Sequence, residues 1–85
     1  MDYRTDKKII NEGLRKVADL NIGIAKLEQV NPADPYITKM YVKSTLCYAV
    51  LEQLIAVDSR VISMHPNTYL QLEMELKRII KTNIN

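Results

Sequence analysis

Apolar residues recur with the period of an α-helix along three stretches of the chain, and no stretch shows the strict alternation of a half-buried strand. Two proline-containing segments, NPADP and MHPNT, separate these stretches. Both segments are rich in turn-forming residues, which favours breaks between helices. The pattern therefore predicts three helices with short connections, which cover residues 6–29, 35–57 and 67–82, with residues 58–63 as an optional continuation of the second.

The first predicted helix is amphipathic. Thr5 or Asp6 is expected to cap its free N–H groups. At 100° per residue its apolar and small residues fall within one arc of about 160°, opposite a charged face. Asn21 and Gly23 favour helix poorly and predict a kink or an early end. The residues of the apolar arc are Ile9, Ile10, Gly13, Leu14, Val17, Leu20, Ile24, Ala25 and Leu27.

The second predicted helix begins at Pro35, because Asp34 is a good N-cap and proline suits the first helical position. Asp58 and Ser59 either end this helix or lie within a longer one. The side chains of its main apolar stripe are predicted to face the core. They are Tyr36, Ile37, Met40, Cys47, Tyr48, Leu51, Leu54 and Ile55.

The third predicted helix begins at about Asn67 or Thr68, since Pro66 ends any helix before it. Thr68 and Gln71 have the spacing of a capping box. Its core-facing stripe consists of Tyr69, Leu72, Leu76, Ile79 and Ile80. Because each amphipathic helix must cover its apolar stripe, these three helices predict an all-α fold, a small up-down-up three-helix bundle in a single domain. Homodimerisation is a way to complete its core, and a helical hairpin whose third helix packs on another chain is the alternative.

The second helix carries more apolar surface than one stripe. A central helix that contacts two neighbours needs a broad apolar face, and this accounts for most of the excess. Residues of the third helix outside its stripe add to the surplus, which also suits a protein interface. We therefore treat six residues as a candidate protein interface: Val42, Leu46, Val50, Val57, Leu70 and Met74.

Charge and composition argue against several classes of partner and indicate a cellular location. The formal charge of +2 comes from 12 basic and 10 acidic side chains without a run of like charge, which does not indicate nucleic acid or an anionic membrane. The single cysteine excludes an internal disulfide and favours a reducing, cytoplasmic location. The opening residues do not resemble a signal peptide. The most apolar stretch, residues 46–57, would be about 18 Å long as a helix against a bilayer core of about 30 Å, so no membrane span is expected.

Candidate catalytic groups are isolated. His65 precedes Pro66, which places it in a turn or a helix cap, and Glu52 is expected at the wet edge of the second helix. No glycine-rich phosphate loop, paired histidine motif or C-x-x-C motif is present. We predict that the chain is not an enzyme and that it needs no metal, no other cofactor and no small-molecule substrate.

These patterns favour a non-enzymatic protein-binding module, a regulator, inhibitor or accessory factor that binds a larger protein, itself, or both. The high content of Ile, Lys and Asn, 24 of 85 residues, suits an AT-rich genome and suggests a phage or plasmid origin. The alternative is a dimeric helical DNA-binding regulator, in which the third helix would read the duplex. The first ten residues of that helix contain two glutamates and no basic residue, and its basic residues come only in its last turns, which makes nucleic acid a poor partner.

Overall fold

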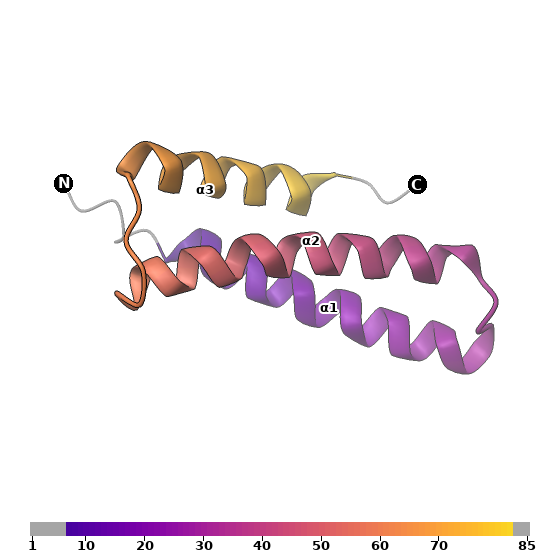
Figure 1. The fold of residues 1–85 in the computed structure, drawn as a ribbon. Helices are drawn as coiled ribbons and strands as arrows, with labels where there is room; N and C mark the ends of the chain where they lie inside the picture. Colours follow the sequence, from indigo (N-terminus) through magenta and orange to yellow (C-terminus); the bar gives the residue numbers. More distant parts are fainter. Residues whose placement is uncertain (1–6, 83–85) are drawn as a thin grey trace.

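The computed structural model describes residues 7–82, which form three helices and no strand (Figure 1). They are α1 (Lys8–Val30), α2 (Pro35–Asp58) and α3 (Pro66–Lys81). Figure 1 shows α2 running back along α1 and α3 running back along α2, and each helix packs against the other two. The predicted all-α, up-down-up three-helix bundle is confirmed.

The start of α2 follows the sequence prediction, and α3 begins one residue before the predicted Asn67, with His65 in the capping role that was one of its two predicted roles. The Asp34 carboxylate accepts a hydrogen bond from the backbone N–H of Tyr36 at 2.9 Å. The N-cap of α3 is His65, whose Nδ1 accepts from the backbone N–H of Asn67 at 3.1 Å, and the helix begins at Pro66. The capping box at Thr68 was therefore wrong, because Thr68 already lies in the first turn. The predicted caps of α1, Thr5 and Asp6, lie outside the described residues.

The C-terminus of α2 is closed by a Schellman motif. The N–H of Arg60 donates to the carbonyl of Val57 at 3.0 Å, and the N–H of Val61 donates to the carbonyl of Ala56 at 2.8 Å. Arg60 has a φ of 64°, the left-handed conformation that this motif requires and that glycine adopts most easily. The helix therefore ends at Asp58, and residues 59–63 do not extend it as a continuous helix.

The buried side chains form two clusters. The larger cluster lies among all three helices and the smaller one between α1 and α2 only, because α3 is shorter than α2 by about 12 Å at 1.5 Å per residue. We call these parts the three-helix segment and the two-helix arm. The three-helix segment buries Ile9, Ile10, Cys47, Val50, Leu51, Leu54, Val57, Tyr69, Leu76 and Ile79. The two-helix arm buries Leu20, Ile24, Ile37 and Met40, with Leu27 packed against them.

Gly13 allows α1 to approach the other two helices closely. A Cβ atom at this position would lie 2.8 Å from Cδ2 of Leu51 and 3.1 Å from Cδ2 of Leu76. At Gly23, in the arm, the nearest atom to an added Cβ would be Sδ of Met40 at 3.6 Å, an ordinary contact. The helix α1 continues through Gly23 to Val30, so the predicted early end does not occur.

The core-facing side of α2 is rotated relative to the predicted stripe. Tyr36, Tyr48 and Ile55 were expected in the core and are exposed by more than a third of their surface. The residues that replace them on the buried side include Lys43, Ser44 and Val50. The reason is that α2 packs against both neighbours: Ser44 donates to Asn21 of α1, and Lys43 donates to carbonyl oxygens at the end of α3. The buried face therefore lies between those neighbours and is not centred on the most apolar arc.

Candidate functional site

The six candidate interface residues divide into buried and exposed sets. Val50 and Val57 are 9% and 2% exposed and belong to the core of the three-helix segment, so their assignment to an open surface was wrong. The flank of α2 that carries them is covered by α3. The other four side chains keep about half or more of their surface in solvent. Their exposed fractions are 54% for Val42, 50% for Leu46, 48% for Leu70 and 69% for Met74.

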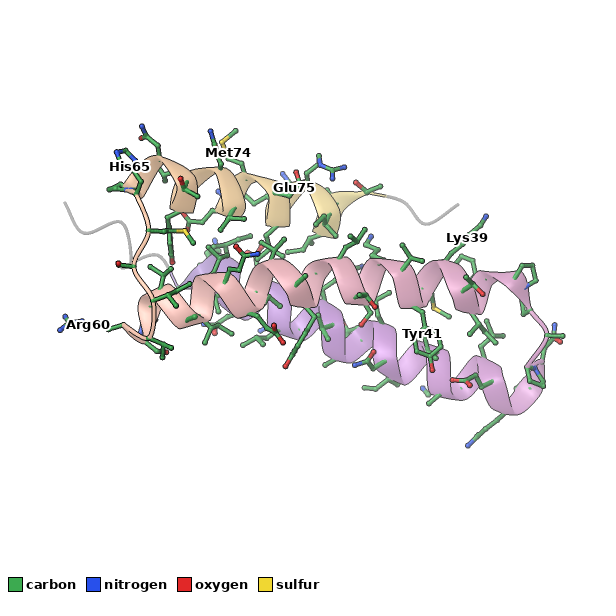
Figure 2. All side chains as sticks on the ribbon, in the orientation of Figure 1. Lys39, Tyr41, Arg60, His65, Met74 and Glu75 are labelled. Carbon is green, nitrogen blue, oxygen red and sulfur yellow. The ribbon has the colours of Figure 1, made fainter. Side chains whose placement is uncertain are left out.

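The four exposed residues lie on two separate surfaces. Val42 and Leu46 line a groove together with Arg78, Ile79 and Thr82 of the C-terminal part of α3. Leu70 and Met74 lie on the other flank of α3. At 100° per residue, they are on one side of the core-facing stripe, whereas Ile79 at the edge of the stripe and Thr82 beyond it are on the opposite side. Figure 2 shows Met74 directed away from α1 and α2. The structure thus joins Val42 with Leu46 but not with Leu70 and Met74.

The groove between α2 and α3 has a volume of about 350 Å³. It lies where α3 ends against α2, at the junction of the three-helix segment and the two-helix arm. Its apolar surface comes from Val42, Leu46 and Ile79, and the polar side chains around them are Thr38, Lys39, Lys43, Arg78 and Thr82. An apolar floor with a few polar groups at the rim is typical of a binding surface.

Lys43 fixes the end of α3 to α2. Its side chain is 9% exposed, and Nζ donates to the carbonyl oxygen of Ile80 at 3.4 Å and to that of Thr82. These carbonyls lie at the C-terminal end of α3, where the partial negative charge of a helix favours a cation. Burial lowers the pKa of the Lys43 ammonium below its ordinary value. The residue therefore holds the two walls of the groove together.

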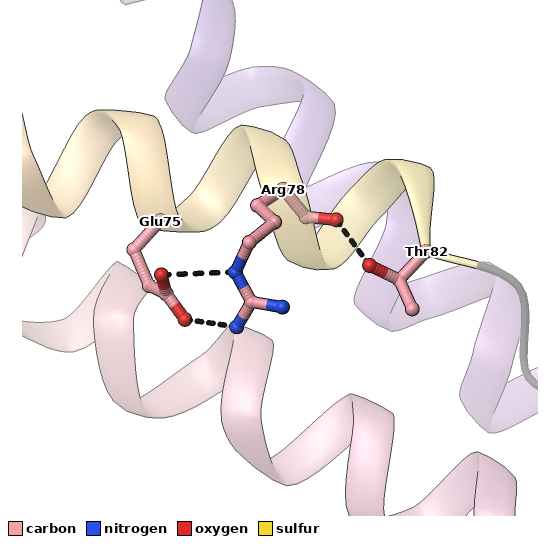
Figure 3. A network of polar contacts seen from close by, with 3 residues as sticks. All are labelled: Glu75, Arg78 and Thr82. Carbon is pink, nitrogen blue, oxygen red and sulfur yellow. Dashed lines mark hydrogen bonds and ion pairs between the residues drawn. The ribbon is translucent and has the colours of Figure 1, made fainter.

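Arg78 lies at the other wall and is held by its neighbours on α3 (Figure 3). The guanidinium donates to both carboxylate oxygens of Glu75, through Nε at 3.1 Å and through Nη2. These hydrogen bonds lower the pKa of Glu75 and raise that of Arg78. The carbonyl oxygen of Arg78 accepts from the Thr82 hydroxyl at 2.6 Å. Since the Arg78 side chain is still 62% exposed, it can also contact an anion from outside the chain.

The rim of the groove is basic. Lys39, Lys43 and Arg78 line it, and no carboxylate is among its lining residues within the described part of the chain. Residues 35–51 of α2 contain two lysines and no aspartate or glutamate. The overall charge of +2 gives no indication of this local excess, because the three cations come from two helices that the fold brings together.

A second groove, of about 410 Å³, is lined by α1 and α2 alone. The Ser44 hydroxyl donates to Oδ1 of Asn21 at 3.0 Å in its floor, and Glu52 lies at its edge and is exposed, as predicted. The Tyr41 hydroxyl donates to Glu28 at 3.2 Å, and this hydrogen bond raises the pKa of Tyr41. The polar groups of this second groove are thus hydrogen-bonded or solvated. Its wall combines apolar and polar side chains, which are Val17, Thr45, Tyr48 and Ala49.

The groups considered for catalysis remain apart. His65 uses Nδ1 to cap α3, and Cys47 has no exposed surface, so that burial raises the pKa of its thiol. Within residues 7–82 no group of three or more His, Cys, Asp or Glu side chains is placed to hold a metal ion. None of the helices in that range is both long and apolar enough to cross a bilayer.

Comparison of the chain with protein-family models, curated proteins and solved structures found no match.

Proposed function

We propose that this chain is a protein-binding module that acts on a larger protein, as a regulator, inhibitor or accessory factor, through the groove between α2 and α3. The observation that carries the proposal is that Val42 and Leu46 stay half exposed on a rigid helix, beside Ile79, in a groove of about 350 Å³. Apolar side chains held in a concave surface gain most when another protein covers them.

The size of the domain supports the same proposal. A chain of this length buries only about 60–65% of the surface that it exposes when unfolded, so its own stability is small. A partner that binds only the folded chain raises that stability by an amount that grows with the ratio of the partner's concentration to its Kd. Covering the groove at the junction with the two-helix arm would stabilise the part of the molecule with the smaller core.

DNA binding receives less support. In a helix-turn-helix the two helices cross at about 90–120° and are joined by a turn of about 3–4 residues. Here α3 runs back beside α2 after a connection of residues 59–65 (Figure 1). The central part of α3 carries Glu75 on its accessible side, and such a carboxylate would repel phosphates.

The test is quantitative affinity capture from the source cells with the parent chain, Leu46→Glu and Ala25→Glu. Both substituted positions are exposed on helices, so both variants should fold like the parent, which thermal unfolding followed by circular dichroism checks. We expect one protein, or the chain itself, to be retained by the parent and by Ala25→Glu and to be lost with Leu46→Glu. Size-exclusion chromatography with light scattering of the same three chains separates self-association from binding to another protein.

The proposal fails if the three chains retain the same proteins and all are monomers. Binding to duplex DNA that weakens steeply with salt and does not respond to Leu46→Glu would favour the DNA-binding alternative.

A further inference from the structure

We infer that the occupant of the α2–α3 groove is an acidic amphipathic helix of another protein, with an apolar stripe flanked by Asp or Glu. This inference rests on the proposed function and names the class of partner. Its two supports are the charge of the rim and the shape of the apolar floor.

The charge of the rim selects an acidic partner. The exposed cations beside the apolar floor are Lys39 on α2 and Arg78 on α3, whose side chain stays 62% exposed although it binds Glu75. Lys43 is buried and already donates to carbonyl oxygens at the end of α3. Opposite charges at the rim of an interface speed association and exclude wrong partners. A segment with carboxylates beside its apolar side chains would find a cation on both walls of the groove.

The shape of the floor suits a helix. Val42 and Leu46 are four residues apart on α2, so they form a ridge parallel to the helix axis, with Ile79 of α3 across from it. Helices bind such grooves through apolar residues at positions i, i+3 or i+4, and i+7. Within residues 7–82, α2 extends about 12 Å farther along the two-helix arm than α3 does, so the helical surface of α2 continues past the groove.

A second copy of the chain fits this groove poorly. In a two-fold symmetric dimer the same surface of both copies meets, so the exposed Lys39 and Arg78 would face the same basic rim of the other copy. Like charges across an interface oppose association. The groove therefore favours a different protein over self-association.

The experiment uses two synthetic helical peptides that share one leucine stripe at i, i+4 and i+7. One carries glutamates on both sides of the stripe, and its matched control carries lysines at the same positions. Binding is followed by fluorescence anisotropy, and the site is mapped by amide chemical shifts of the labelled full chain. We expect the glutamate peptide to bind at least about tenfold more tightly than the lysine peptide, a difference of about 1.4 kcal/mol, and to shift the amides of Val42, Leu46 and Ile79.

The test variant is Lys39→Glu with Arg78→Glu, and its matched control is Arg15→Glu with Lys26→Glu, which makes the same change in net charge on exposed positions of α1. The groove variant should reverse the order of the two peptides. The control should keep the order of the parent chain. Circular dichroism melts show whether each variant is folded.

The inference is overturned if the glutamate peptide does not shift the groove amides, or if both peptides bind equally. Dodecanoate, a small amphiphilic anion, is titrated as a third probe. Shifts at the groove with dodecanoate but not with the peptide would indicate a site for a small anion in place of a helix. Failure of the inference is distinguishable from failure of the proposed function. If a captured protein is lost with Leu46→Glu but still binds the charge-reversed groove variant, the protein-binding proposal stands and the acidic helix is wrong.

Discussion

The three-helix segment and the two-helix arm are built from the same two long helices, yet they differ in how completely they exclude water. The three-helix segment has a centre with no exposed surface, at Cys47, Leu54 and Leu76, although side chains at its edge retain up to 9% at Val50. The four buried side chains of the arm each retain 3–7%, so the arm has no such centre. The difference comes from α3, which covers one part of the α1–α2 pair and ends before the other. A helical hairpin alone buries one stripe on each helix, and a third helix is needed to close the core.

The groove lies at the boundary between these two parts. Val42 and Leu46 continue along α2 from the flank that α3 covers at Val50, and they become exposed where α3 ends. The candidate binding surface is thus the continuation of the core of the three-helix segment. This relationship explains why apolar residues stand there, and it predicts that the arm is the less stable part of the fold.

The largest expected difference is between core truncations in the two parts. Leu54→Ala should lower the free energy of unfolding by about 3–5 kcal/mol, because a fully enclosed site leaves a cavity that its neighbours cannot fill. Ile24→Ala in the arm should cost about 2–3 kcal/mol, since a site between two helices can collapse more easily. Urea denaturation of both variants measures the two losses. Equal losses would mean that α3 contributes no additional enclosure.

Native-state hydrogen exchange tests the same contrast without a substitution. Amides of Cys47, Leu51 and Leu54 should exchange only through global unfolding, while those of Ile24 and Met40 should exchange through local opening of the arm. We expect the opening free energies to differ by at least about 1.4 kcal/mol, a tenfold difference in exchange rate. The Cys47 thiol gives an independent measure, because its reaction with a disulfide reagent should have the same opening free energy as the Leu54 amide. A uniform free energy over both parts would argue for one cooperative unit.

The two glycines of α1 test the difference in packing between the three-helix segment, at Gly13, and the two-helix arm, at Gly23. Gly13→Ala inserts a methyl group against Leu51 and Leu76, and overpacking of about 1–3 kcal/mol should outweigh a helix propensity gain of about 1 kcal/mol. Gly23→Ala meets only Met40 at 3.6 Å and should stabilise the chain by about 0.5–1 kcal/mol. Thermal unfolding of the two variants gives the signs. If both substitutions stabilise, Leu51 can move aside and α1 does not depend on a close approach at Gly13.

Sequence periodicity was sufficient for the number, order and approximate bounds of the helices, because each helix carries a stripe that only a helix can bring onto one face. It was not sufficient for the direction of the buried face of α2. Val50 and Tyr48 are both candidates on a helical wheel, and only the position of α3 decides that the first is buried and the second exposed. Local caps were equally ambiguous, since Thr68 and His65 both have side chains that can accept from a helix N-terminus.

The candidate site was predicted in part for the same reason. Val42 and Leu46 were recognised as surplus apolar residues of one helix. The cations beside them belong to two helices. Lys39 and Arg78 line the same groove only because α3 ends where it does. A run of seventeen residues in α2 with two lysines and no acidic residue was the only local sign of a basic rim, and charge totals over the whole chain conceal it.

The smallest expected effects compare the two ends of α2. Asp34→Ala removes the N-cap at the arm and should destabilise the chain by about 1 kcal/mol. Arg60→Gly at the other end relieves a left-handed conformation that costs a side chain about 1 kcal/mol, and part of this gain is offset because glycine adds freedom to the unfolded chain. The net result should be a stabilisation of about 0.5 kcal/mol. In hydrogen exchange, Asp34→Ala should speed the arm amides more than those of the three-helix segment, whereas Arg60→Gly should slow the global exchange of Leu54. If Asp34→Ala accelerated the exchange of all amides equally, the arm would unfold only together with the rest of the molecule. The two parts would then differ in packing but not in stability.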